Sequence, residues 1–83
     1  MEKEELIKLL NEDLAKEFAA AVQYIQHAAT ITGAKYQSIQ KELVIHATEE
    51  MEHANQLAIQ IDFLGGVPTT DVDTRYTSDD SAE

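Results

Sequence analysis

Two carboxylates and a histidine occupy positions where a helix of this chain should present apolar residues. Glu50 and His53 lie in the stretch "EEMEHA", and their spacing of three residues puts both on one face of a helix. Glu17 lies earlier in the chain, one heptad before Tyr24, in a row that is otherwise apolar. Each residue alone could be a satisfied core polar group or part of a solvated face. Because burying unpaired carboxylates is costly, the three together in one interior layer predict a bound metal ion.

The composition limits which metals and partners suit the chain. It has no cysteine, so oxygen and imidazole nitrogen must hold any metal, which favours iron, manganese or zinc. Sixteen acidic and six basic residues give a formal net charge of −10, which attracts cations and repels phosphate backbones and anionic lipids. We therefore expect no nucleic-acid or membrane partner. The acidic amino terminus and the lack of a long apolar stretch predict a cytoplasmic protein.

Two long helices must position these residues. Helix-forming residues without proline or glycine run from residue 4 to about residue 32, and their apolar positions recur at helical spacing. A second helix is predicted from about residue 38 to residue 64, where the sequence "LGGVP" ends it. The connection between them contains Gly33, which can adopt a left-handed conformation. Because this connection is short, the helices must lie antiparallel.

The apolar rows of the two helices predict how they pack. In the first helix the rows are Ile7, Leu14, Ala21, Ala28 and Leu10, Glu17, Tyr24, Ile31; in the second they are Ile39, His46, His53, Gln60 and Leu43, Glu50, Leu57, Leu64. Other apolar residues lie off these rows and need covering. We therefore expect an all-α fold in which residues 1–64 form a hairpin that is half of a four-helix bundle. Either a second copy or a missing C-terminal half of the polypeptide completes that bundle.

Residues 65–83 are predicted to form a polar connection or tail. They contain few apolar residues and no periodic pattern. Asp80 and Glu83 at its end form a capping-box signature for a third helix.

The spacing of the candidate ligands resembles that of a known family of helical proteins. A glutamate opposite a Glu-x-x-His motif on an antiparallel neighbour is half of the carboxylate-bridged di-iron arrangement of helical bundles. "LLNEDLAKEFAAAVQYIQHA" and "EEMEHANQLAIQIDFLGGVP" resemble the first two helices of the ferritin-like superfamily, especially the bacterioferritins, over residues 5–70. This resemblance implies that Glu17 is a terminal ligand, Glu50 a bridging ligand and His53 a nitrogen ligand of a di-iron ferroxidase centre. It also implies a hydrogen-bonding or electron-transfer role for Tyr24, which could equally be a core residue.

Two further residues have alternative roles. Met51 lies roughly 100° around the helix from Glu50. The resemblance implies that it can ligate haem across a subunit interface, although methionine also fills apolar interfaces without a cofactor. His46 lies one heptad before His53 and could bind a metal in transit or hydrogen-bond a ligand carboxylate.

The resemblance implies an iron-oxidising and iron-storing protein that uses Fe²⁺ with O₂ or peroxide. It would be a ferroxidase if a second chain or a second half of the polypeptide completes the site. It would assemble as a homo-oligomer that is at least a dimer and could be a cage. One alternative is a di-metal peroxidase or a manganese catalase-like protein. The other is a non-catalytic helical assembly module, in which the polar layer only fixes the relative position of the helices.

Overall fold

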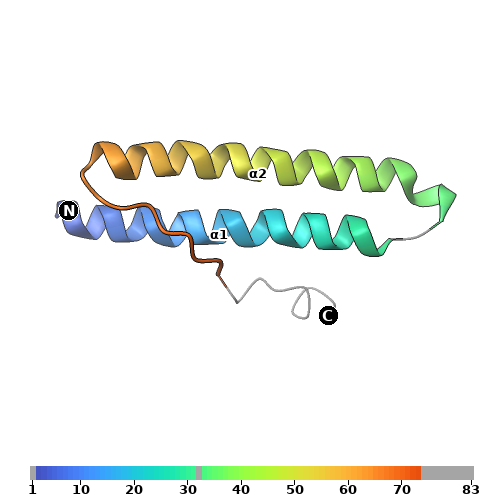
Figure 1. Ribbon diagram of the computed structural model, residues 1–83, viewed down its shortest axis with the longest axis horizontal. Helices are drawn as coiled ribbons and strands as arrows, with labels where there is room; N and C mark the ends of the chain where they lie inside the picture. The colour runs from blue at the N-terminus through green and yellow to red at the C-terminus, as the bar shows by residue number, and fades with distance from the viewer. Residues whose placement is uncertain (1, 32, 74–83) are drawn as a thin grey trace.

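The chain folds as an antiparallel pair of long helices. The computed structural model describes residues 2–31 and 33–73. Helix α1 spans Lys3–Thr30, and helix α2 spans Gln37–Phe63, with one 3-10 turn, η1 (Ala34–Tyr36), between them. The two helices lie side by side along their whole length (Figure 1). The described residues contain no strand, so the predicted all-α hairpin is confirmed.

Glycines form the turns at both ends of the hairpin. Gly33 has a φ of 101° and Gly65 a φ of 88°, values that residues with a side chain rarely adopt. At the end of α2, the Gly65 N–H donates to the Asp62 carbonyl and the Gly66 N–H donates to the Ile61 carbonyl, each over 2.9 Å. This is the Schellman arrangement, which satisfies two carbonyls that the helix itself leaves unpaired. The sequence "LGGVP" therefore ends α2 by a defined hydrogen-bonding pattern.

The hairpin core is narrow and rich in alanine. Leu14 and Ile61 are fully buried and form one cluster with Ala54. The side chains packed around this cluster are Ile7, Leu10, Phe18, Leu57 and Ala58. Ala21 and Ala47 extend the buried seam toward the connection between the helices.

One predicted contact row is wrong. The structure buries Ala47, Ala54 and Ile61 on α2, which lie one residue further along the chain than the row we expected. Small alanine side chains let the two helix backbones approach, and this rotates the expected row out of the seam. The residues of that row, all of them exposed, are Ile39, His46, His53 and Gln60.

Considerable apolar surface is open to solvent in this hairpin. Phe63 and Val67 are 88% and 82% exposed, and ten other large apolar residues are between a third and two thirds exposed. Among these are Val22, Ile25, Ile39, Val44, Ile45 and Ile59. Exposed apolar surface of this extent marks faces that pack against another element. No helix within the described residues is long and apolar enough to cross a membrane.

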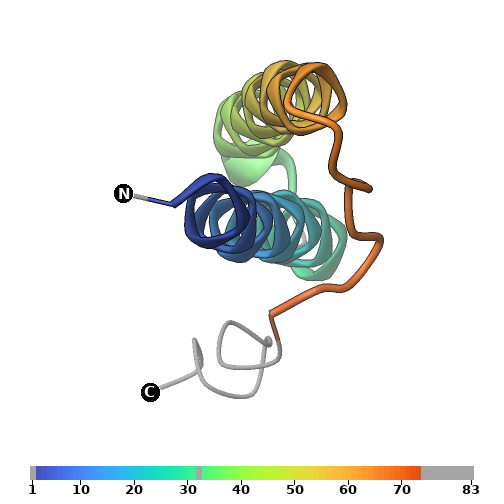
Figure 2. The same cartoon turned by 90° about the vertical axis from the view of Figure 1, so that its left-hand side faces the viewer.

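After α2 the chain returns along α1 as an extended segment (Figures 1 and 2). The Asn11 side chain donates to the Val67 carbonyl over 3.2 Å and accepts a hydrogen bond from the Thr69 N–H over 2.8 Å. Further on, the Asp73 N–H donates to the Ala15 carbonyl over 3.1 Å. Residues 64–73 lack regular secondary structure but are held against α1. The capping-box signature in residues 80–83 lies outside the described residues.

Candidate metal centre

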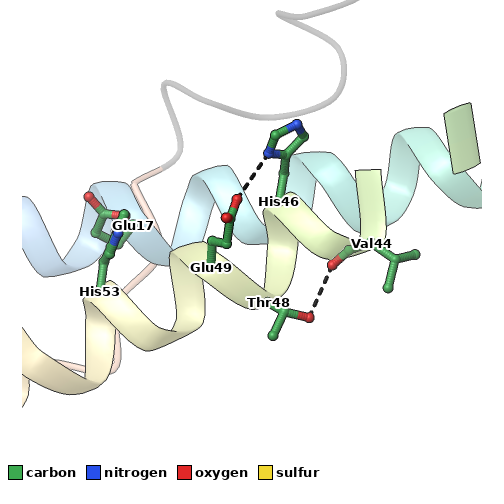
Figure 3. Close-up of polar contacts among 6 residues, drawn as sticks. All are labelled: Glu17, Val44, His46, Thr48, Glu49 and His53. Carbon is green, nitrogen blue, oxygen red and sulfur yellow. Dashed lines mark hydrogen bonds and ion pairs between the residues drawn. The ribbon is translucent and has the colours of Figure 1, made fainter. Parts of the chain in front are cut away.

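Three side chains from the two helices meet at the middle of the hairpin. Glu17 comes from α1, and Glu50 and His53 come from successive turns of α2. One potential ligand atom of each lies within 4.8 Å of the others, and within the described residues this is the one such group of three. The His53 Nδ1 lies 3.6 Å from the Glu17 Oε2, and Figure 3 shows these side chains pointing toward one another.

The burial of the group is uneven. The Glu17 side chain is 26% exposed, Glu50 is half-buried, and the His53 side chain is 58% exposed. The Glu17 Oε2 atom is buried and has no hydrogen-bond partner among the described residues. Its nearest charged partner, the His53 Nδ1 atom, is 3.6 Å away, and a buried carboxylate oxygen without a hydrogen bond is uncommon. A cation at this point would satisfy it.

The electrostatics of the group also favour a cation. The side-chain contact with Glu50, followed by burial and by the charge of Glu50, raises the pKa of Glu17 from 4.5 to about 6; the neighbouring His53 partly offsets this rise. Two adjacent carboxylates repel each other when both are ionised, so the pair retains a proton more readily than a single glutamate. A metal ion can take the place of that proton. Two hard oxygen donors and one imidazole nitrogen form a set that suits iron.

The two other residues predicted near the site contact each other instead. The Tyr24 and His46 rings have their centroids 5.4 Å apart at an angle of 35°. The His46 Nδ1 pairs with the Glu49 Oε1 over 3.1 Å (Figure 3). His46 is therefore outside the three-residue group, one heptad toward the connection. This pairing is not among the predicted contacts, although a His-x-x-Glu spacing on one helix face could have indicated it.

Met51 lies away from the group of Glu17, Glu50 and His53. It is about half exposed and lines an apolar groove with Val22 and Ile25 of α1. Because Met51 follows Glu50 by one residue, the groove lies about 100° around α2 from the Glu50 side chain. Its role as a haem ligand stays a prediction.

The fold and the candidate site are those of a helix pair in which two carboxylates and a histidine from adjacent helices come together. The family model for the ferritin-like domain of ferritins matches residues 7–81. A bacterioferritin from Desulfovibrio desulfuricans is 34% identical over 68 residues, which cover 82% of this chain and 38% of that relative. The chain belongs to the ferritin-like domain family.

A solved structure supports the same assignment. The ferritin-like, diiron-carboxylate protein from Bacillus anthracis str. Ames superposes with a TM-score of 0.80 and 40% sequence identity. The match covers 88% of this chain and 54% of that one. The predicted resemblance is thus confirmed, and the chain spans about half the length of its solved relative and less than half of the curated one.

Proposed function

We propose that the chain binds iron through Glu17, Glu50 and His53 and oxidises Fe²⁺ for iron storage or detoxification. A further pair of helices would supply the remaining ligands, in an assembly that is at least a dimer. The observation that carries the proposal is the buried, unpartnered Glu17 Oε2 atom beside the other two ligands. The choice of iron is supported by two relatives. The solved relative is a diiron-carboxylate protein, and the other relative is a bacterioferritin.

The residues of the chain suit this chemistry. Iron would take the place of the proton that Glu17 retains more readily than an ordinary glutamate, and the two carboxylates would offset the additional charge of Fe³⁺. Buried Leu14 and Ala54, each one helical turn from a ligand, keep the inner side of the site apolar and so strengthen its electrostatic interactions. Two iron ions held by carboxylates can deliver two electrons at once to O₂ or peroxide. His53 would supply an imidazole nitrogen, a ligand that adds no negative charge.

The test is an anaerobic Fe²⁺ titration followed by exposure to air. We expect the purified chain to retain iron and to develop ferric absorbance rapidly when O₂ is added. The Glu50→Ala variant should lose both iron retention and the rapid phase. Glu52→Ala is the matched control, because Glu52 lies on the same helix but is exposed and outside the group.

Two outcomes would redirect the proposal. Equal iron retention in the Glu50→Ala variant and the unaltered chain would falsify the ligand assignment. Sustained turnover of peroxide without accumulation of ferric iron would indicate a peroxidase that uses the same residues.

A further inference from the structure

Acidic residues are distributed unevenly along the chain. All sixteen lie in residues 2–17 and 42–83, so the 24 residues from Phe18 to Lys41 contain none. That stretch carries Lys35 and Lys41 and has a formal charge of +2. The other 59 residues have sixteen acidic and four basic side chains and a formal charge of −12.

The fold places the acid-free stretch at one end of the hairpin. It comprises the second half of α1, the connection with η1 and the first turn of α2 (Figure 1). The acidic residues of α1 lie in its first half, toward the open end of the hairpin, where α1 begins and α2 ends. Within the described residues, the charge of α1 therefore changes from acidic at the open end to acid-free at the connection end.

An apolar groove on α2 lies within this connection end. We call it the connection groove, and it is lined by Gln37, Gln40, Lys41, Val44 and Ile45. Val44 is 45% exposed and Ile45 is 52% exposed. Within residues 2–31 and 33–73, no carboxylate lies within ion-pair distance of Lys41. The next residue, Glu42, points about 100° around α2 from Lys41. The groove thus combines exposed apolar side chains with an ammonium group that has no carboxylate partner there.

A surface of opposite charge lies on α1 near the open end. Leu9 is 44% exposed, and the exposed residues Glu5 and Asp13 lie four positions before and after it on the same helix face. We call these three residues the acidic face. Four positions also separate Lys41 from Ile45 in the connection groove. When Leu9 packs on Ile45, a carboxylate therefore lies opposite Lys41 in either direction of the docked helix.

One copy of the chain cannot join these two surfaces to each other. Leu9 is the seventh residue of α1, and Ile45 is the ninth residue of α2. Because the helices are antiparallel, these positions lie toward opposite ends of the hairpin (Figure 1). Both side chains are also exposed rather than buried between the helices. A contact between the two surfaces must therefore join two molecules.

We propose that the acidic face of one copy of this chain docks in the connection groove of a second copy, head to tail. Leu9 then covers Val44 and Ile45, and a carboxylate of the acidic face pairs with Lys41. The partner is a second copy because the chain itself carries a surface that matches the groove in charge and in residue spacing.

Electrostatics favour this orientation over others. Copies with a formal charge of −10 repel one another overall. The head-to-tail arrangement sets the acid-free end of one copy against the acidic end of the next, so repulsion is smallest there and attraction fixes the orientation. Each added copy leaves one groove and one acidic face free, so assembly continues until a ring closes. The contact uses none of the proposed iron ligands and is independent of the iron chemistry.

The test is sedimentation velocity of the full 83-residue chain over a range of concentrations, in EDTA so that metal ions contribute nothing. One variant, Lys41→Glu, reverses the charge of the groove. A second variant carries Glu5→Lys and Asp13→Lys together and reverses the acidic face. Lys16→Glu is the control, because it changes the net charge as Lys41→Glu does, at an exposed position outside both surfaces. All these positions are exposed and helical, so the variants should fold, which circular dichroism verifies.

We expect each reversed variant alone to associate more weakly, with an apparent dissociation constant raised by about fivefold or more, because like charges then face each other. An equimolar mixture of the two should associate as the unaltered chain does, since the reversed groove then meets the reversed acidic face. Lys16→Glu should differ from the unaltered chain by less than about twofold.

The double variant distinguishes this contact from a general effect of charge. It reduces the formal net charge from −10 to −6, so general repulsion alone would make it associate more strongly than the unaltered chain. Stronger association of the double variant would overturn the inference. So would an equal loss in Lys16→Glu and Lys41→Glu, a mixture that associates no better than its components, or an unaltered chain that stays monomeric throughout.

Discussion

Replacing Glu17 by glutamine should stabilise the metal-free chain at neutral pH, although it removes a metal ligand. The contact with Glu50 and the burial of the carboxylate raise the pKa of Glu17 from 4.5 to about 6. A carboxyl whose pKa is higher in the folded state binds more protons there than in the unfolded chain. The contribution of Glu17 to folding stability is therefore fully present below pH 4.5 and is lost as pH rises through about 6.

The size of this effect follows from the two pKa values. The difference between 4.5 and about 6 corresponds to a loss of about 2 kcal/mol from the free energy of unfolding, at about 1.36 kcal/mol per pH unit. Because the Glu17 side chain retains 26% exposure to solvent, this figure is an upper bound. Glutamine has nearly the same shape and no charge, so it avoids the loss.

The assay is urea unfolding followed by circular dichroism, in EDTA and at fixed chain concentration. The unfolding free energy of Glu17→Gln minus that of the unaltered chain should increase between pH 4.5 and pH 7.5, by up to about 2 kcal/mol. Taking this difference removes the contributions of the other carboxylates. Glu52→Gln, an exposed position on α2, is the control and should show no such trend. A difference that is constant across this pH range, or that decreases, would refute the reasoning.

Two further predictions concern the turn and the segment after α2. The Gly66→Ala change should destabilise the chain by about 1–3 kcal/mol in urea unfolding, because the added Cβ would lie 2.6 Å from the Ile7 Cγ2 atom. The control is Thr70→Ala, at an exposed position. If Gly66→Ala has the same unfolding midpoint as this control, the Ile7 side chain can move away from the added Cβ and the prediction is wrong. The Asn11→Leu change removes both side-chain hydrogen bonds to the returning segment and should speed hydrogen exchange of the Thr69 amide by about tenfold or more. Unchanged exchange would mean that other contacts hold the segment.

The sequence predicts the helices and the ligand group because both depend on local patterns. The helix ends follow from glycines that take positive φ, as Gly33 and Gly65 do, and the observed bounds lie within two residues of the expected ones. Glu17, Glu50 and His53 converge because they lie near the middle of antiparallel helices of similar length.

The sequence does not predict which row of α2 faces α1. Two neighbouring rows both carry apolar residues, and the structure buries the one with Ala47 and Ala54. Hydrophobicity alone gives alanine little weight, although its small size lets the helix backbones approach closely. The hydrogen bonds from Asn11 to Val67 and Thr69 could not be predicted either. They join residues that are 56 and 58 positions apart, and such contacts leave no periodic pattern in the sequence.

The most direct test of the central claim is X-ray absorption spectroscopy of the iron-loaded chain. The chain has three histidines, His27, His46 and His53, so imidazole scattering can be assigned by substitution. We predict an oxygen-rich shell with one imidazole per iron, which His53→Gln removes and which His46→Gln and His27→Gln preserve. Imidazole scattering that survives in His53→Gln, or that disappears in His46→Gln, would contradict the site described above.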